Sequence, residues 1–373
     1  MTDAYALAPA LRAELAFLGG SAPENEKPQN LIGYTLVATQ ERFDARHLVE
    51  VGIGCESCHG GAREHIADPR VHPDFQPRGA GIAVVHADGS PVGAVEAENR
   101  ACARCHSVLL SEYDHTWEGG GRHRNDGHDE LVGGSTINSG EARDYLLGGC
   151  AKAMACTTCH DPHAVDAAAR LDALATPAGN GVCTSCHTQY TTPEALRAHG
   201  HHDPTGLGAS CVGCHMPRKN AGLSYQLERY HRIGSPDDPA RVEADRPLEC
   251  ATCHRDKTVA TLVSAMEGWW GKRYDRAKLR ALYGDDLDVA VLDATLARGL
   301  PHERTAAVAL LGERGDRKAI DGLVHAFSDE LPLTRYFARE ALRSLLGTLP
   351  PVDMSLPAPA LEAAVRAWIK TLP

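Results

Sequence analysis

Residues 156–160 read Cys-Thr-Thr-Cys-His, and residues 183–187 repeat the pattern as Cys-Thr-Ser-Cys-His. Working outward from them, the same spacing recurs at four further places, and 12 of the 13 cysteines belong to these motifs. The paired cysteines are Cys55/Cys58, Cys102/Cys105, Cys156/Cys159, Cys183/Cys186, Cys211/Cys214 and Cys250/Cys253, and the histidines that follow them are His59, His106, His160, His187, His215 and His254. Such repetition is not expected by chance, so these motifs are the main clue to the fold.

The spacing within each motif suits covalent attachment of a haem. Two thiols three positions apart reach the two vinyl groups on one edge of a porphyrin, and the next histidine offers its imidazole to the iron. We therefore predict six haem c groups, attached through the twelve cysteines and ligated by the six motif histidines. Three alternatives fit less well. Structural zinc gives no reason for a histidine after every pair, thioredoxin-like sites occur singly, and disulfide scaffolds are usually short.

Each haem iron has a second axial position, and its occupant decides the chemistry. A second histidine gives a low-potential electron carrier, methionine raises the potential, and an open position permits substrate chemistry. The chain has 20 histidines, so 14 remain after the six in the motifs, which is enough for bis-histidine ligation throughout. Residues 198–202 read Ala-His-Gly-His-His and offer three candidates, of which His202 is the predicted ligand. The full set of predicted second ligands is His47, His65, His115, His163, His202 and His231.

Composition restricts the partners of the protein. The net charge of −11 argues against nucleic acid or an anionic membrane surface, which both attract a basic face. No apolar run is long enough to span a bilayer. Aromatic residues make up 5% of the chain although hydrophobic residues make up 43%, so we expect porphyrins to fill part of the core. Residues 1–20 contain Asp3, Arg12 and Glu14 and do not fit a secretion signal.

Beyond the motifs, the sequence predicts a mainly α fold with much irregular coil. We predict a six-haem cytochrome c domain over residues 1–256 and a HEAT-like α-helical repeat domain over residues 257–373. Leu-Pro at 300–301 recurs at 331–332, and each copy precedes an amphipathic helix. About two such repeats cannot bury their own faces, so we expect them to pack on the haem domain. An ordinary helical bundle is the alternative. We also predict a helix near residues 5–18 and another that ends at Gly271.

The order of these segments resembles a known superfamily. GIGCESCHGGAREH, CARCHS, CTTCHDPHA, YHRI and LECATCHRDK occur in sequence, as in the cytochrome module related to hydroxylamine oxidoreductase and its tetrahaem electron acceptor. The chain is more similar still to multihaem cytochromes that carry TPR or HEAT repeats at the C-terminus, over about residues 48–347. Such relatives usually begin with a further Cys-x-x-Cys-His and a Trp…His-His segment, which are not found here. A distal histidine normally supplied by that segment must then come from elsewhere, for example from an identical subunit.

The resemblance implies a periplasmic or extracellular electron carrier with mostly bis-histidine haems, although an export signal is not visible in this chain. It also supports His163, His202 and His231 as second ligands. The expected partners are redox proteins or identical subunits, which would form a homopolymer that conducts electrons. The alternative is an oxidoreductase that acts on a small nitrogen or sulfur compound at one five-coordinate haem. All six motifs end in histidine, which disfavours the lysine-ligated type of catalytic haem.

Overall fold

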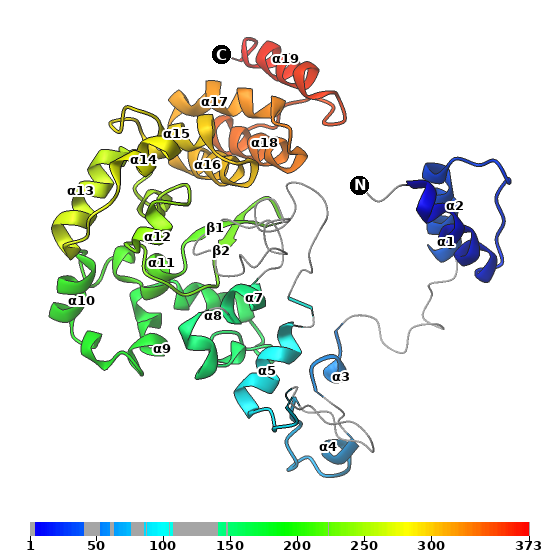
Figure 1. Cartoon of the computed structure of the whole chain (residues 1–373), viewed down its shortest axis with the longest axis horizontal. Helices are drawn as coiled ribbons and strands as arrows, with labels where there is room; N and C mark the ends of the chain where they lie inside the picture. The colour runs from blue at the N-terminus through cyan, green and yellow to red at the C-terminus, as the bar shows by residue number, and fades with distance from the viewer. Residues whose placement is uncertain are drawn as a thin grey trace. The chain divides into compact units, whose positions relative to one another are not determined.

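The structure is a computed structural model, and it describes residues 4–40, 53–59, 63–75, 86, 88–103, 105–106, 141–146, 148–222 and 224–372. These residues are mainly helical with much irregular coil, which confirms the predicted fold class (Figure 1). They form two compact units, Met1–Val92 and Gly93–Pro373. Within the described ranges, no helix is both long and apolar enough to cross a membrane.

The first unit contains four described helices. They are α1 (Ala4–Phe17), α2 (Pro28–Gln40), α3 (Cys55–Cys58) and α4 (Arg63–Ala67). α1 confirms the helix predicted near residues 5–18. It packs against α2, where Leu15 and Leu31 are buried. The guanidinium group of Arg12 donates hydrogen bonds to the backbone carbonyls of Pro23 and Glu24, at 2.8 and 2.7 Å, and so ties down the connection between the two helices.

The second unit carries the remaining described motifs and the helical C-terminal part. Its helices are α5 (Ala94–Ala103), α7 (Glu141–Leu146), α8 (Ala167–Leu174), α9 (Gly181–Thr184), α10 (Pro193–Gly200), α11 (Cys211–His215), α12 (Pro239–Val242), α13 (Val259–Trp270), α14 (Arg276–Tyr283), α15 (Val291–Arg298), α16 (Pro301–Arg314), α17 (Ile320–His325), α18 (Pro332–Leu346) and α19 (Ala358–Ile369). Strands β1 (Arg218–Ala221) and β2 (Leu227–Arg229) pair antiparallel, with Ala221 opposite Leu227. This hairpin was not predicted from the sequence.

Local signals explain where α13 begins and ends. The hydroxyl of Thr258 accepts a hydrogen bond from the N–H of Thr261 at 3.2 Å, which caps one of the helix's unpaired donors. Gly271 follows the helix with φ = +67°, a conformation that glycine adopts without the steric cost other residues incur. The predicted helix end at Gly271 is therefore confirmed.

The two predicted repeat helices are present as α16 and α18. They begin at Pro301 and Pro332, and each is followed by a glycine with positive φ, Gly315 at +71° and Gly347 at +72°. The two helices pack against one another. Their equal starts and ends match the predicted repeat, while the HEAT-like class of this region stays a prediction.

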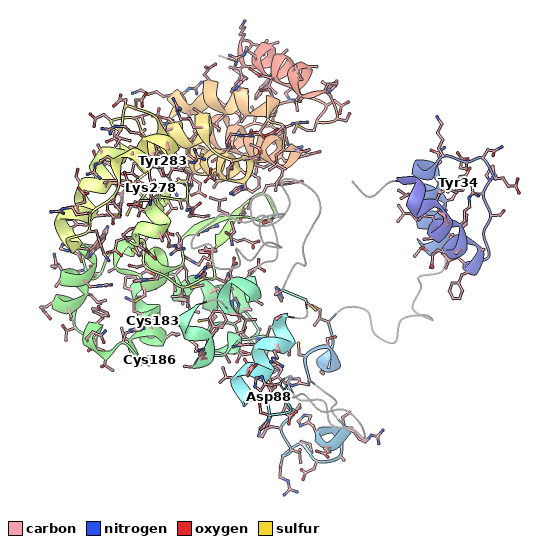
Figure 2. All side chains as sticks on the ribbon, in the orientation of Figure 1. Tyr34, Asp88, Cys183, Cys186, Lys278 and Tyr283 are labelled. Atoms are coloured by element: carbon pink, nitrogen blue, oxygen red, sulfur yellow. The ribbon has the colours of Figure 1, made fainter. Side chains whose placement is uncertain are left out.

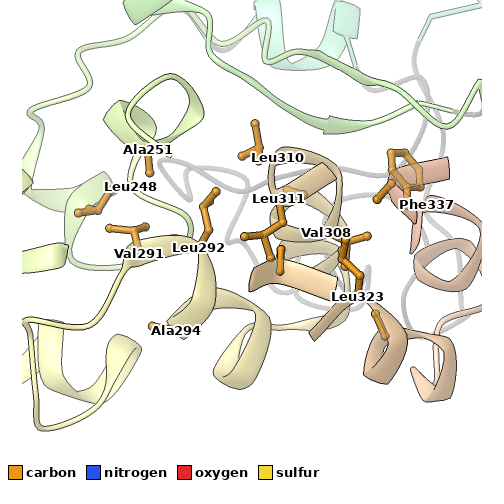
Figure 3. Packing of buried hydrophobic residues seen from close by; sticks show 14 of the residues in the cluster. Leu248, Ala251, Val291, Leu292, Ala294, Val308, Leu310, Leu311, Leu323 and Phe337 are labelled. Atoms are coloured by element: carbon orange, nitrogen blue, oxygen red, sulfur yellow. The ribbon is translucent and has the colours of Figure 1, made fainter. Parts of the chain in front are cut away.

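One hydrophobic core joins the helical part to the last motif. Leu248, just before the motif that begins at Cys250, and Ala251, within that motif, lie near Val291 and Leu292 of α15 (Figure 3). The same core continues through α16 to Phe337 of α18. The expected packing of the helical region on the motif region is confirmed. Because the core crosses the boundary predicted between residues 256 and 257, that boundary stays a prediction.

The tip of the β1–β2 hairpin makes a second contact with the helical region. The ring of Tyr225 stacks on Tyr336 of α18 with ring centres 5.4 Å apart, and it meets Phe337 edge-on at 6.1 Å. Aromatic pairs in these arrangements stabilise a contact beyond the area they bury. The hairpin therefore links the segment after the fifth motif to α18.

Candidate haem sites

All six motifs share one local geometry. In five of them the backbone N–H of the histidine donates to the carbonyl of the first cysteine at 2.9–3.0 Å, which closes a single helical turn, and the remaining one, the fifth motif along the chain, forms α11. Residues three apart lie on one face of such a turn, so both thiols point the same way. None of the twelve cysteines is fully buried, and Figure 2 marks one pair, Cys183 and Cys186. Both thiols of each motif are therefore accessible for thioether formation.

Four of the predicted attachment cysteines are less enclosed than a cofactor-binding residue usually is. Cys55, Cys105, Cys186 and Cys253 are exposed, whereas the other eight motif cysteines are half-buried. Three of the four are the second cysteine of their motif, and a single short turn has few side chains of its own to cover both thiols. Protein atoms alone therefore do not enclose Cys105 or Cys253, and an attached porphyrin would have to cover their sulfur atoms. Attachment at these positions, as at the other motif cysteines, stays a prediction.

The segment that holds the third, fourth and fifth motifs has almost no core of its own. Between residues 151 and 216 the buried residues are Ala151, Asn180 and Ser210. By contrast, α16 alone buries most of its length. A segment that folds must bury apolar surface somewhere, and large flat macrocycles supply such surface. The side chains of this segment thus fit a region that packs around haem.

Three motif histidines each face a second histidine from elsewhere in the chain. The ring centres of His215 and His199 are 5.9 Å apart, with their planes within 3° of parallel. The ring centres of His160 and His231 are 6.1 Å apart, with an interplanar angle of 21°. Those of His254 and His202 are 5.8 Å apart, at 31°.

These separations fit a metal ion held between two imidazoles. A ligating imidazole nitrogen lies about 2 Å from its metal and the ring centre roughly 1 Å further, so two rings on opposite sides of one ion have centres about 6 Å apart. Rings in direct stacking contact would lie closer, as Tyr190 and His199 do at 4.3 Å. The ring separation in each of the three pairs therefore matches that of two imidazoles on one iron.

Several of these histidines have their second ring nitrogen tied to the backbone. The Nδ1 atom lies 2.8 Å from the Gly234 carbonyl in His215, 2.6 Å from the Gly200 carbonyl in His202, and 2.9 Å from the Arg229 carbonyl in His231. A histidine that binds a metal almost always donates its other ring N–H in this way, which sets the tautomer and the ring orientation. The bonds leave Nε2 as the ligating atom.

Burial favours the neutral form of four of the paired imidazoles. It lowers the pKa of His160, His199, His231 and His254, because the charged form loses its solvation. Only the neutral ring has a lone pair for a metal. The environment of these rings thus favours the ligating form.

The described contacts of the remaining histidines are of other kinds. His163 follows the third motif in a turn where its N–H donates to Asp161 at 3.0 Å. In the first unit, His65 Nδ1 lies 2.8 Å from the Val71 carbonyl, and His59 Nδ1 lies 3.3 Å from the Asp74 carbonyl. His106 and His187 stand at the ends of their motif turns, whereas His47 and His115 lie outside the described residues. Ligation by His47, His65, His115 and His163 stays a prediction, as does iron ligation by the other predicted histidines.

His199 was not among the predicted ligands, although the segment that contains it was. His199 lies in the last turn of α10, and His201 follows the helix with φ = +56°. This left-handed residue reverses the chain, so His199 faces His215, His202 faces His254, and His201 stacks on Trp269 at 4.9 Å. The local sequence does not distinguish the three histidines. The left-handed backbone at His201 directs their side chains toward different partners.

The comparison with protein families adds an independent finding. A family described as the doubled CXXCH motif matches residues 149–192, which contain the third and fourth motifs. The doubled motif indicates a multihaem c-type cytochrome. Proteins of this kind carry covalently bound haem c and typically lie outside the cytoplasm. No curated protein and no solved structure matches the chain.

Helix α13 has a clear structural role beside His199 and His202. The indole N–H of Trp270 donates to the backbone carbonyl of His199 at 2.9 Å. Trp269 stacks on His201 and meets the ring of His202 edge-on, with ring centres 6.5 Å apart. The first helix after the last motif therefore supports both histidines that face the fifth and sixth motifs.

A buried charged pair lies directly before the sixth motif. Arg241 and Glu249 are buried, and Arg241 Nη2 lies 3.0 Å from Glu249 Oε1. Arg241 also lies over the ring of Tyr230, 5.0 Å from its centre. Its Nε and Nη1 atoms have no hydrogen-bond acceptor within the described part of the chain. A buried donor without an acceptor is costly, and a haem propionate is an acceptor that would suit this position.

Proposed function

We propose that the protein carries six covalently attached haems, mostly with two histidine ligands each, and passes electrons along them. The observation that carries this proposal is the set of three motif histidines that each face a second histidine at 5.8–6.1 Å. Bis-histidine haem iron exchanges electrons at low potential without an open coordination position. The residues would hold each haem by two thioethers and two imidazoles.

The protein's own side chains prepare each site for that role. The backbone carbonyls of Gly200, Arg229 and Gly234 orient His202, His231 and His215 by accepting from Nδ1. One axial ring of each pair is then held before the metal binds, which limits the rearrangement that accompanies a change in its charge. This arrangement supports electron transfer rather than substrate binding at the third, fifth and sixth motifs.

The helical region is proposed to be a HEAT-like platform for a partner. Support comes from α16 and α18, which repeat the same start and end and pack side by side. We propose a periplasmic or extracellular location, with redox proteins or identical subunits as partners. A homopolymer would allow electrons to travel beyond one chain.

The proposal is tested on exported, purified protein by intact mass and by electron paramagnetic resonance. Six attached haems predict a mass increase of six haem groups that survives acid-acetone extraction. Ferric protein should give low-spin signals only. A mass equal to the bare polypeptide would overturn the proposal. A stoichiometric high-spin signal would instead favour the oxidoreductase with one five-coordinate haem.

A further inference from the structure

Two buried asparagines occupy equivalent places in the motif region. Asn99 and Asn180 each lie three positions before the first cysteine of a motif, Cys102 and Cys183 respectively. They are 1% and 6% exposed. Asparagine is usually exposed, and Asn180 is one of the few buried residues of its segment. Their burial therefore calls for a specific set of partners.

Both side chains reach across to the next motif. Asn99 Oδ1 accepts the N–H of Cys156 at 2.9 Å, and Asn180 Oδ1 accepts the N–H of Cys211 at 2.8 Å. In each case the acceptor comes from one motif and the donor is the first cysteine of the following motif. The first N–H groups of a helical turn have no partner within the turn, so each asparagine acts as a cap supplied by a different motif.

The amide nitrogens complete the same arrangement. Asn99 Nδ2 donates to the carbonyls of Ala151 and Met154 at 3.2 and 3.3 Å. Asn180 Nδ2 donates to the carbonyl of Ala209 at 2.8 Å. Each amide thus bonds the backbone just before a motif as well as its first cysteine. Both ends of the side chain hold the second motif in place.

The cysteines of the joined motifs also meet. Cys102 raises the pKa of Cys156, and Cys211 raises the pKa of Cys183, so the two cysteines of each pair lie near one another. The corresponding positions three residues before the other four motifs are Gly52, Ala153, Gly208 and Pro247. The asparagine therefore marks the second and fourth motifs, and the chain from the second to the fifth motif contains two copies of one two-motif unit.

We infer that Asn99 and Asn180 are positioning residues that hold the second and third haems, and the fourth and fifth haems, as two close pairs. This inference rests on the proposed function, because it requires haem at each of the four motifs. The asparagines touch neither iron nor porphyrin in this role. They set the distance and register between two attachment turns, and hence between the two groups attached there.

The test compares Asn180→Ala, Asn99→Ala and the double variant with the natural protein. Close haems interact electronically and split the Soret band in circular dichroism into a two-signed couplet. Each single variant should lose the contribution of one pair and the double variant that of both, with the attached haem mass unchanged. Asn220→Ala is the matched control, since Asn220 is also buried but lies in β1. It should leave the couplet intact.

Asn180→Asp provides a second variant that keeps the oxygen accepting from Cys211. It should retain more of the couplet than Asn180→Ala, and it decides the matter if the alanine variant does not accumulate. A full haem mass with an unchanged couplet in Asn180→Ala would overturn the inference. So would a natural protein without a couplet, or an equal loss in Asn220→Ala. Absence of attached haem in the natural protein would instead overturn the proposed function itself.

Discussion

The ring of His199 lies 5.9 Å from the ring of His215, and the two planes are within 3° of parallel. His199 comes from the last turn of α10, whereas His215 ends the fifth motif in α11. Because 3-10 and coil segments connect them, their alignment is a product of tertiary structure rather than of local spacing. Their relationship gives the most direct prediction about ligation.

His199→Ala should leave the haem of the fifth motif with one protein ligand. An open axial position converts low-spin ferric iron to high-spin, so one haem equivalent of high-spin signal should appear in electron paramagnetic resonance. His201→Asn is the control, because asparagine tolerates the left-handed backbone at that position and His201 stacks on Trp269. Spectra of His199→Ala that remain wholly low-spin would remove His199 from the ligand set.

How far the sequence predicts these sites depends on the range of the interactions. The motif turns and the end of α13 both depend on neighbouring residues, and the helix end at Gly271 was predicted correctly. The pairing of His231 with His160, and of His202 with His254, agrees with two predicted second ligands, but the choice of partner required the fold. No local pattern indicates that a residue 71 positions away supports His199 through its indole.

Two further features escaped prediction for physical reasons. β1 reads Arg-Lys-Asn-Ala and lacks the alternating apolar residues that mark a strand. Its Lys219 is buried all the same, because it forms an ion pair with Asp245. Asn99 looks like an ordinary polar helix residue until the third motif is placed against it. Polar residues that are buried by long-range partners carry no signal in their own segment.

Trp270→Phe should loosen the hold on His199 without removing it. The change deletes the hydrogen bond from the indole to the His199 carbonyl, a loss of about 1 kcal/mol. A less firmly held ligand dissociates more often, so the reduced variant should bind carbon monoxide faster at one haem. Trp368→Phe in α19 is the control for removing an indole elsewhere in the second unit. Equal rates in both variants and the natural protein would show that α13 does not support this ligand.

Glu249 should make stability depend on pH. Burial raises the pKa of its carboxyl group to about 7, from a usual value of 4.5, although the positive charge of Arg241 opposes the shift. Between these two values the folded protein binds more protons than the unfolded chain. The contribution to stability is therefore complete below about pH 4.5 and is lost as the pH rises through about 7, by a total of about 3 kcal/mol.

The measurement is the free energy of unfolding against pH for the natural protein and for Glu249→Gln. Glutamine does not titrate, so the stability of the natural protein minus that of the variant should fall between about pH 4.5 and pH 7. A constant offset from the altered contact with Arg241 does not affect this slope. Parallel curves over that range would show that Glu249 titrates normally in the folded protein.

Arg246 and Glu303 connect the approach to the sixth motif with α16, and breaking this pair should weaken the second unit. The Arg246 side chain donates through Nε to Glu303 Oε2 at 2.9 Å and through Nη1 to the carbonyls of Leu282 and Arg298, both at 2.7 Å. The arginine and glutamate are 7% and 2% exposed. Arg246→Met leaves a buried carboxylate without its cation, which typically costs about 3–5 kcal/mol. Thermal unfolding should therefore begin at a clearly lower temperature, while the attached haem mass stays the same.

The double variant Arg246→Met/Glu303→Leu removes the unpaired buried charge as well and should recover part of the loss, because an apolar pair of similar volume often replaces a buried ion pair without penalty. If the double variant is no more stable than Arg246→Met, the carbonyl contacts at Leu282 and Arg298 carry the stabilisation instead of the charge pair.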